Sequence, residues 1–120
     1  MTYCKPDINE YDVLRATKEL LKDPKNWTQG KSARDVNSVP CEPSSPQATC
    51  WCLTGAAYKV SASLFNKSNF SENWLEALHL LQQVVPGGWI GPWNDAKDRT
   101  HAEVLNMIDL ALDQEPIERS

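Results

Sequence analysis

Apolar residues recur every three or four positions in four stretches of the chain, and this spacing is typical of amphipathic helices. The stretches cover residues 7–22, 46–63, 71–85 and 100–112. In the second stretch apolar residues surround most of the helix, and Lys59 is its single charged residue. We therefore expect the second helix to lie at the centre of the fold.

The ends of these helices carry capping signals. Ser45 precedes a proline, which is the pattern of an N-cap followed by the first helical position, and Ser71 is a similar candidate cap. Thr100 and Glu103 have the spacing of a capping box, in which each side chain accepts a hydrogen bond from the other residue's backbone N–H. The Pro-Gly-Gly sequence at residues 86–88 is expected to end the third helix.

Residues 27–39 lack helical periodicity. Their tryptophan, threonine and valine residues favour extended structure, and residues 35–38 are turn formers. The fold class is therefore mainly α (α+β), with four helices around one core and a short β-hairpin near residues 27–39. We expect a single domain over residues 1–120, with its ordered core at about 7–113.

Composition narrows the class of protein. The chain has 120 residues, and its 12 basic and 16 acidic residues leave a net charge of −4, which argues against binding to duplex nucleic acid. No apolar run approaches the roughly 18 residues of a membrane span, and the first residues do not resemble a secretory signal. We therefore expect a cytoplasmic protein with no membrane contact, in which the four cysteines are reduced.

Three ordered motifs resemble a known family. They are Trp27-Thr28-Gln29-Gly30 with Ala33-Arg34-Asp35, then Trp51-Cys52-Leu53-Thr54-Gly55-Ala56, then Trp93-Asn94-Asp95 with Arg99-Thr100 and Glu103-Val104. In this order, over about residues 10–113, the set resembles a family of short bacterial and phage proteins of unknown function. The resemblance implies a cytoplasmic bacterial or phage origin, and it implies no activity.

A candidate ligand site lies in the loop before the last helix. Its residues are Trp89, Trp93, Asn94, Asp95 and Arg99, joined by Arg34 from the hairpin segment. Helix N-termini bind anions, and tryptophan with arginine stacks on rings, so the group predicts a small anionic, nucleotide-like ligand. In the alternative, structural interpretation Trp93 packs near the helix start and Asp95 caps loop amides. Arg99 then pairs with Asp35 or Asp95.

The cysteines and histidines suggest two further hypotheses. Cys50 or Cys52 near a helix start, with His101 as a base, would make a thiol enzyme. Together with Cys41 and His79 they could instead bind a metal ion, but the paired C-x₂-C spacing of structural zinc sites is missing. Cys50 and Cys52 also point to opposite sides of the expected helix, so we expect no metal and no cofactor.

These observations define no catalytic constellation. The sequence therefore predicts a non-enzymatic binding or regulatory module that acts through a protein partner, in the host cytoplasm if it is phage-encoded. A small-ligand, nucleotide-like binding protein is the first alternative, and a Cys/His thiol enzyme is the second.

Overall fold

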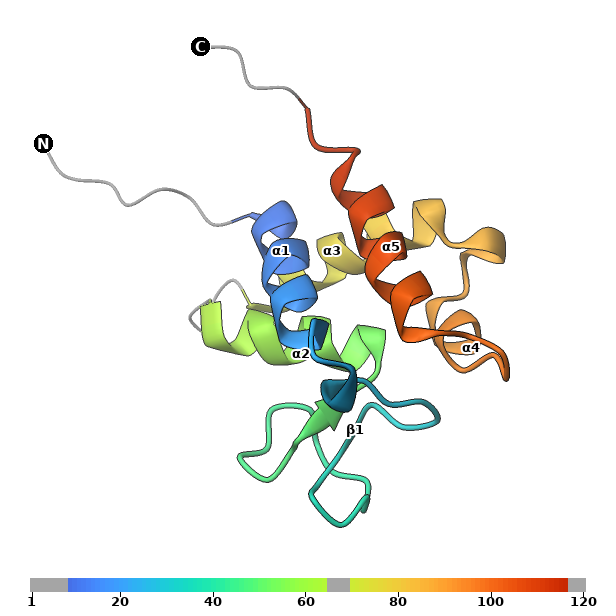
Figure 1. Cartoon of the computed structure of the whole chain (residues 1–120). Coiled ribbons are helices and arrows are strands. Elements are labelled where there is room, and N and C mark those ends of the chain that lie inside the picture. The colour runs from blue at the N-terminus through green and yellow to red at the C-terminus, as the bar shows by residue number, and fades with distance from the viewer. Residues whose placement is uncertain (1–8, 65–69, 117–120) are drawn as a thin grey trace, which may run out of the picture.

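A computed structural model describes residues 9–64 and 70–116 of the chain (Figure 1). Its long helices are α1 (Glu10–Leu21), α2 (Leu53–Leu64), α3 (Phe70–Val84) and α5 (His101–Leu112). The shorter elements are the helix α4 (Ile90–Asn94), the 3₁₀ turns η1 (Pro24–Asn26) and η2 (Pro86–Gly88), and the strands β1 (Ala33–Arg34) and β2 (Cys50–Trp51). The mainly helical class, with four long helices and a small sheet in this part of the chain, is confirmed.

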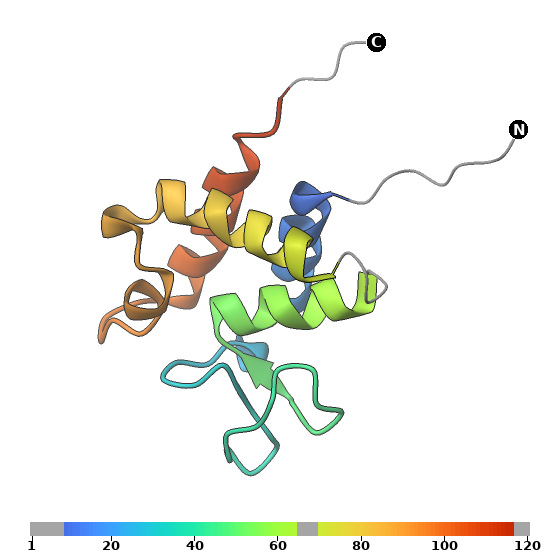
Figure 2. The same ribbon diagram turned by 180° about the vertical axis from the view of Figure 1, so that it is seen from behind.

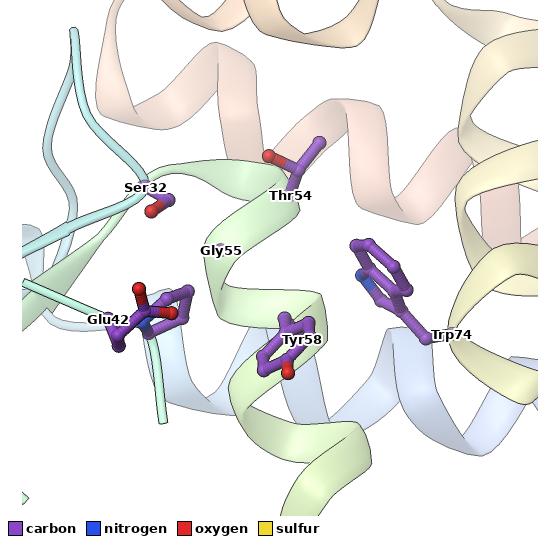
Figure 3. A pocket seen from close by; sticks show the side chains of 7 residues that line it. Ser32, Glu42, Thr54, Gly55, Tyr58 and Trp74 are labelled. Carbon is purple, nitrogen blue, oxygen red and sulfur yellow. The ribbon is translucent and has the colours of Figure 1, made fainter. Parts of the chain in front are cut away.

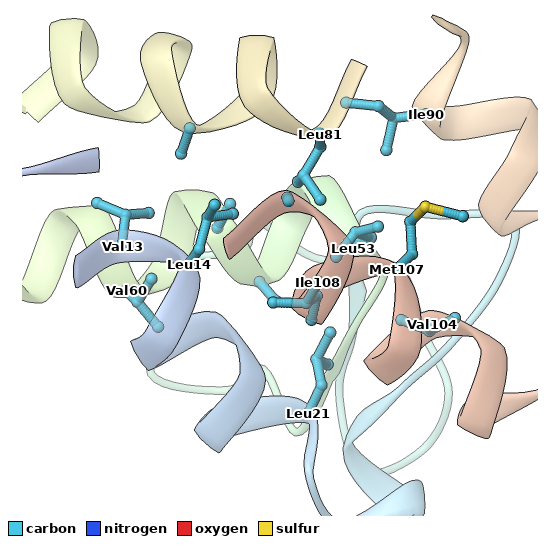
Figure 4. Close-up of a cluster of buried hydrophobic side chains, with 14 of the residues drawn as sticks. Val13, Leu14, Leu21, Leu53, Val60, Leu81, Ile90, Val104, Met107 and Ile108 are labelled. Atoms are coloured by element: carbon cyan, nitrogen blue, oxygen red, sulfur yellow. The ribbon is translucent and has the colours of Figure 1, made fainter. Parts of the chain in front are cut away.

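The four long helices share one hydrophobic core. Helix α1 packs against α2, α3 and α5, and α3 also packs against α2 and α5. The fully buried side chains in this cluster include Leu14, Leu53, Leu81 and Ile108, one from each long helix (Figure 4). The loop-rich segment between η1 and β2 lies on the side of α2 that faces away from α3, as the view from behind shows (Figure 2). No helix in the described residues is long and apolar enough to cross a bilayer.

Helix α1 begins with a capping box that the sequence analysis missed. The Asn9 side chain accepts hydrogen bonds from the backbone N–H groups of Tyr11 and Asp12, at 3.0 and 3.1 Å. The Asp12 carboxylate accepts in return from the Asn9 backbone at 3.0 Å. Because this cap fixes the first turn, the helix begins at Glu10. The expected start at residue 7 lies outside the described residues.

Helix α2 begins seven residues later than predicted. Ser45 does bind the Gln47 amide, but it closes only a single turn. Residues 50–51 are extended because they pair with β1 as an antiparallel strand, with Ala33 opposite Trp51. The helix is capped instead by Cys52, whose sulfur accepts from the Gly55 N–H at 3.3 Å.

The small sheet has a different partner strand from the expected hairpin. Strand β1 pairs with β2, Arg34 also bridges to Pro40, and Trp27 bridges to Trp51 in a parallel sense. Residues 35–39 form the tight turn, in which the Asp35 carboxylate accepts from the backbone of Asn37 at 2.8 Å. The β-branched residues that suggested strands, Val36 and Val39, lie exposed on this turn. Side-chain type therefore predicted neither the residues that form the strand nor the partner with which it pairs.

The ends of α3 and α5 follow the local signals with one exception. Helix α3 starts at Phe70, so Ser71 lies inside its first turn and is not its cap. The helix ends before η2, where Gly87 and Gly88 adopt positive φ angles of 79° and 77°. The capping box of α5 is confirmed by hydrogen bonds in both directions between Thr100 and Glu103, at 3.1 and 2.9 Å.

Candidate functional site

The three sequence motifs meet around the side chain of Asn94, which is 1% exposed. Its oxygen accepts from the Trp27 indole N–H at 2.8 Å and from the Leu53 backbone N–H at 3.2 Å. Its nitrogen donates to the Thr28 carbonyl at 3.2 Å and to the Asp95 carboxylate at 2.9 Å. These four bonds use both donors and both acceptor positions of the amide, so Asn94 holds three chain segments together.

Gln29 and Gly30 complete this arrangement. The Gln29 amide donates to the carbonyls of Asn94 and Ala96, at 2.8 and 2.9 Å. The Gly30 N–H donates to the Asp95 carboxylate at 2.9 Å. The motif residues that bind one another here are called the Asn94 cluster, namely Trp27, Thr28, Gln29, Gly30, Leu53, Asn94 and Asp95. In the described structure their polar groups face one another, which makes the cluster a structural support.

The remaining residues of the proposed ligand loop also bind within the protein. Trp93 is buried at 8% exposure, and the Arg99 guanidinium carbon lies 3.9 Å from the centre of its ring. Arg99 donates to the Trp93 carbonyl and pairs with Glu103 at 3.3 Å, whereas the structural interpretation expected Asp35 or Asp95 as its partner. Among the described residues, Trp89 is bound to this group only through its carbonyl, which accepts from the Trp93 N–H at 3.0 Å, and the residue is 72% exposed.

Arg34 is linked to the cluster through its neighbours. Its guanidinium donates to the carbonyls of Gln29 and Ser38, at 3.0 and 3.1 Å, and to the Thr28 hydroxyl at 3.1 Å. These bonds join the two loops that flank β1. Of the six candidate ligand residues, the structure thus gathers Trp93, Asn94, Asp95 and Arg99, connects Arg34 through Gln29, and leaves Trp89 exposed.

The cysteines and His101 face different partners. The His101 ring nitrogen contacts the Leu21 carbonyl at the end of α1, at 2.6 Å. Cys52 caps α2, and the Cys50 sulfur lies 4.0 Å from the Arg34 carbonyl. In residues 9–64 and 70–116 no hydrogen bond joins either thiol to His101, and no group of three metal-ligating side chains occurs.

The thiol of Cys41 has the electrostatics of a poor nucleophile. Desolvation, and then the nearby Asp35 carboxylate, raise the pKa of this thiol above its ordinary value. A raised pKa leaves less of the reactive thiolate at neutral pH. Among the described cysteines, Cys41 is therefore not an activated nucleophile.

A surface cavity of about 250 Å³ lies on α2, and its lining shares no residue with the Asn94 cluster (Figure 3). Its lining comes from the loop segment, from α2 and from α3, and consists of Ser32, Glu42, Pro43, Thr54, Gly55, Tyr58 and Trp74. Sequence analysis did not select these residues as a site. The available signal was the placement of Tyr58 and Trp74, aromatic side chains with a polar tip, in otherwise apolar helical stretches.

Two aromatic rings form walls of the cavity at right angles. The centres of the Tyr58 and Trp74 rings are 5.1 Å apart, and their planes meet at 87°. The Trp74 indole N–H is buried and has no hydrogen-bond partner in the described structure. An unpaired buried donor costs roughly 1–3 kcal/mol, so this group is a feature that a ligand could satisfy.

Comparison with known proteins gives a family and nothing closer. A family model described as "Family of unknown function (DUF6197)" matches residues 6–114. No curated protein and no solved structure matches the chain. The matched range contains every helix and strand from α1 to α5, and thus both the Asn94 cluster and the cavity on α2.

Proposed function

Starting from the finding that this chain belongs to the DUF6197 family of unknown function, we propose that it is a non-enzymatic binding module that acts through a protein partner. The observation that carries this proposal is the cavity on α2, with the unpaired indole N–H of Trp74 in its wall. A buried donor without an acceptor is rare in folded proteins. Ligand pockets are mostly apolar with a few polar groups that orient the ligand, and an unpaired donor in an aromatic wall fits that description.

The size of the cavity favours a protein partner over a small ligand. Pockets that enclose drug-sized molecules measure roughly 300–1,000 Å³. At about 250 Å³, this cavity is better matched to one side chain that projects from a larger partner. Single side chains anchored in such pockets carry much of the affinity of many interfaces.

The chemistry of the lining favours binding over catalysis. Glu42 is the only carboxylate in the lining, which contains no histidine, cysteine or lysine. General acid–base catalysis most often uses histidine, and covalent catalysis uses a nucleophile next to a base. The motifs resemble those of short bacterial and phage proteins, and this resemblance supports the further proposal of a partner in a bacterial cytoplasm.

Selection from a peptide library tests this function. A random peptide library displayed on bacteriophage is selected against the wild-type protein and against Ser32→Trp, which fills the cavity from its edge. Lys31→Trp is the matched control, because Lys31 is the adjacent residue along the chain, is exposed and does not line the cavity. Thermal melting verifies that both variants are folded.

We expect the wild type and Lys31→Trp to enrich the same peptides, and Ser32→Trp to lose them. The proposed function fails if the wild type enriches no peptide. It also fails if Ser32→Trp, folded as judged by its melting curve, retains the peptides selected by the wild type.

A further inference from the structure

We infer that the cavity on α2 recognises a basic side chain, lysine or arginine, of the partner, and that a backbone carbonyl of the same partner accepts the Trp74 indole N–H. This inference rests on the proposed function and specifies the chemistry of its ligand. It follows from three features of the cavity, namely a carboxylate without an ion-pair partner in the described residues, a pair of aromatic walls and a buried donor.

The carboxylate is Glu42, which is exposed and forms no ion pair with any residue that the structure describes. Two hydrogen bonds hold its backbone and that of the next residue in place. The Glu42 carbonyl accepts from the Ser45 N–H at 3.0 Å, and the carbonyl of the next residue, Pro43, accepts from the Trp51 indole at 2.8 Å. Trp51 is itself buried in the core. The Glu42 carboxylate is therefore carried to the cavity by a segment whose backbone is already ordered. This order lowers the entropy cost of binding a cation.

The aromatic walls suit the same ligand. A cation near the face of a tyrosine or tryptophan ring is attracted by the ring's quadrupole. Lysine and arginine also carry an apolar stem that packs against such rings while the charged group stays near a carboxylate. In Figure 3, Glu42 and Trp74 lie on opposite sides of the view, with Tyr58 between them. A basic side chain laid across Tyr58 would thus have the carboxylate on one side and the indole on the other.

The buried donor favours a basic residue within a peptide over a free cation as the ligand. The Trp74 N–H needs an acceptor, and neither an ammonium nor a guanidinium group has one. A lysine or arginine residue within a peptide supplies both the cation and a carbonyl oxygen. An acidic side chain is excluded by repulsion from Glu42, and the net charge of −4 attracts basic partners to the protein as a whole.

The test uses the amide of a single residue as its probe. Nα-acetyl-lysine N-methylamide is titrated into ¹⁵N-labelled full-length protein while the indole N–H resonance of Trp74 is followed, and that resonance is assigned by its loss in Trp74→Phe. The matched probes are the arginine amide, the uncharged norleucine amide and the carbonyl-free n-butylamine. The matched variants are Glu42→Gln and Glu19→Gln, which removes an exposed carboxylate of α1 that does not line the cavity.

We expect the lysine and arginine amides to shift the Trp74 resonance saturably, and n-butylamine to shift it much less. Glu42→Gln weakens binding of the lysine amide about fivefold, and Glu19→Gln leaves it unchanged. The inference is overturned if no saturable shift occurs, if the norleucine amide binds as tightly as the lysine amide, or if Glu42→Gln has no effect. If the library selection still yields peptides that depend on an open cavity, the binding function stands and only its basic specificity is wrong. If that selection also fails, both proposals fall.

Discussion

Replacing Gly55 by alanine tests the account of how α2 meets the loop segment. An added Cβ at this position would overlap the Ser32 carbonyl oxygen and would lie 2.9 Å from its carbonyl carbon. Cβ atoms essentially never approach other heavy atoms to under 3.0 Å, and the opposing group is backbone, which cannot rotate away. That carbonyl also accepts the hydrogen bond from the Cys52 N–H at 3.1 Å, next to the start of the helix.

Two opposing effects set the magnitude. Alanine is favoured over glycine in a helix by about 1 kcal/mol. Against this gain, forcing an extra carbon into a packed contact costs about 1–3 kcal/mol, and weakening the Ser32–Cys52 hydrogen bond costs about 1 kcal/mol more. We expect steric overlap to dominate, with a net loss of about 2 kcal/mol in the free energy of unfolding. For a domain of this size that loss lowers Tm by about 8 °C.

The assay is urea unfolding followed by circular dichroism, supported by thermal melting. Gly91→Ala is the matched control, because a Cβ at Gly91, in the short helix α4, would meet no heavy atom within 4 Å. This control should be neutral or more stable by up to about 1 kcal/mol. The reasoning is refuted if Gly55→Ala is as stable as the wild type, or if the two variants lose the same free energy.

Three further substitutions probe other contacts. Asn94→Ala leaves the Leu53 N–H and the Trp27 indole N–H without an acceptor. We therefore expect the free energy of unfolding, measured in urea, to fall by about 3 kcal/mol. A fall below about 1 kcal/mol would show that Asn94 does not hold the segments together. Ser61→Ala removes a buried hydroxyl that has no partner, so the urea midpoint should stay level or rise, and a clear fall would contradict this. The backbone N–H of Thr100, and next Arg99, lower the pKa of Glu103 below its ordinary value. The wild type should therefore melt at a higher temperature than Glu103→Gln, with the full difference present above the unfolded pKa of about 4.3. The difference should shrink as the pH falls through the lower folded pKa. A difference in melting temperature that does not depend on pH would rule this out.

Sequence alone determined the elements whose signals are local. The helical periods, the Thr100–Glu103 capping box and the Pro-Gly-Gly stop each depend on residues within a few positions of one another. Such signals need no knowledge of the rest of the chain, because they act through helix geometry and nearby backbone N–H groups. The same reasoning predicted that α2 is an apolar helix, although not where it begins. Its expected central position was wrong, because α1 is the helix that packs against α2, α3 and α5.

Tertiary structure decided the start of α2, because that start depends on a distant strand. Residues 48–52 fit a helical apolar pattern, yet Trp51 lies opposite Ala33 in the sheet and its indole binds the Pro43 carbonyl. Both interactions satisfy polar groups that a longer helix would leave without these partners. Local propensity is a weak preference, and such pairing overrides it.

Both sites were also decided by the tertiary structure. In the sequence, Asn94 looks like an ordinary polar loop residue. In the structure it is buried and accepts hydrogen bonds from Trp27 and Leu53, which lie 67 and 41 positions away along the chain. The cavity likewise combines Glu42, Tyr58 and Trp74 from a loop and two helices, with no spacing that would connect them in sequence. Their proximity results from packing α2 between α3 and the loop segment, which is a property of the whole fold and of no single stretch.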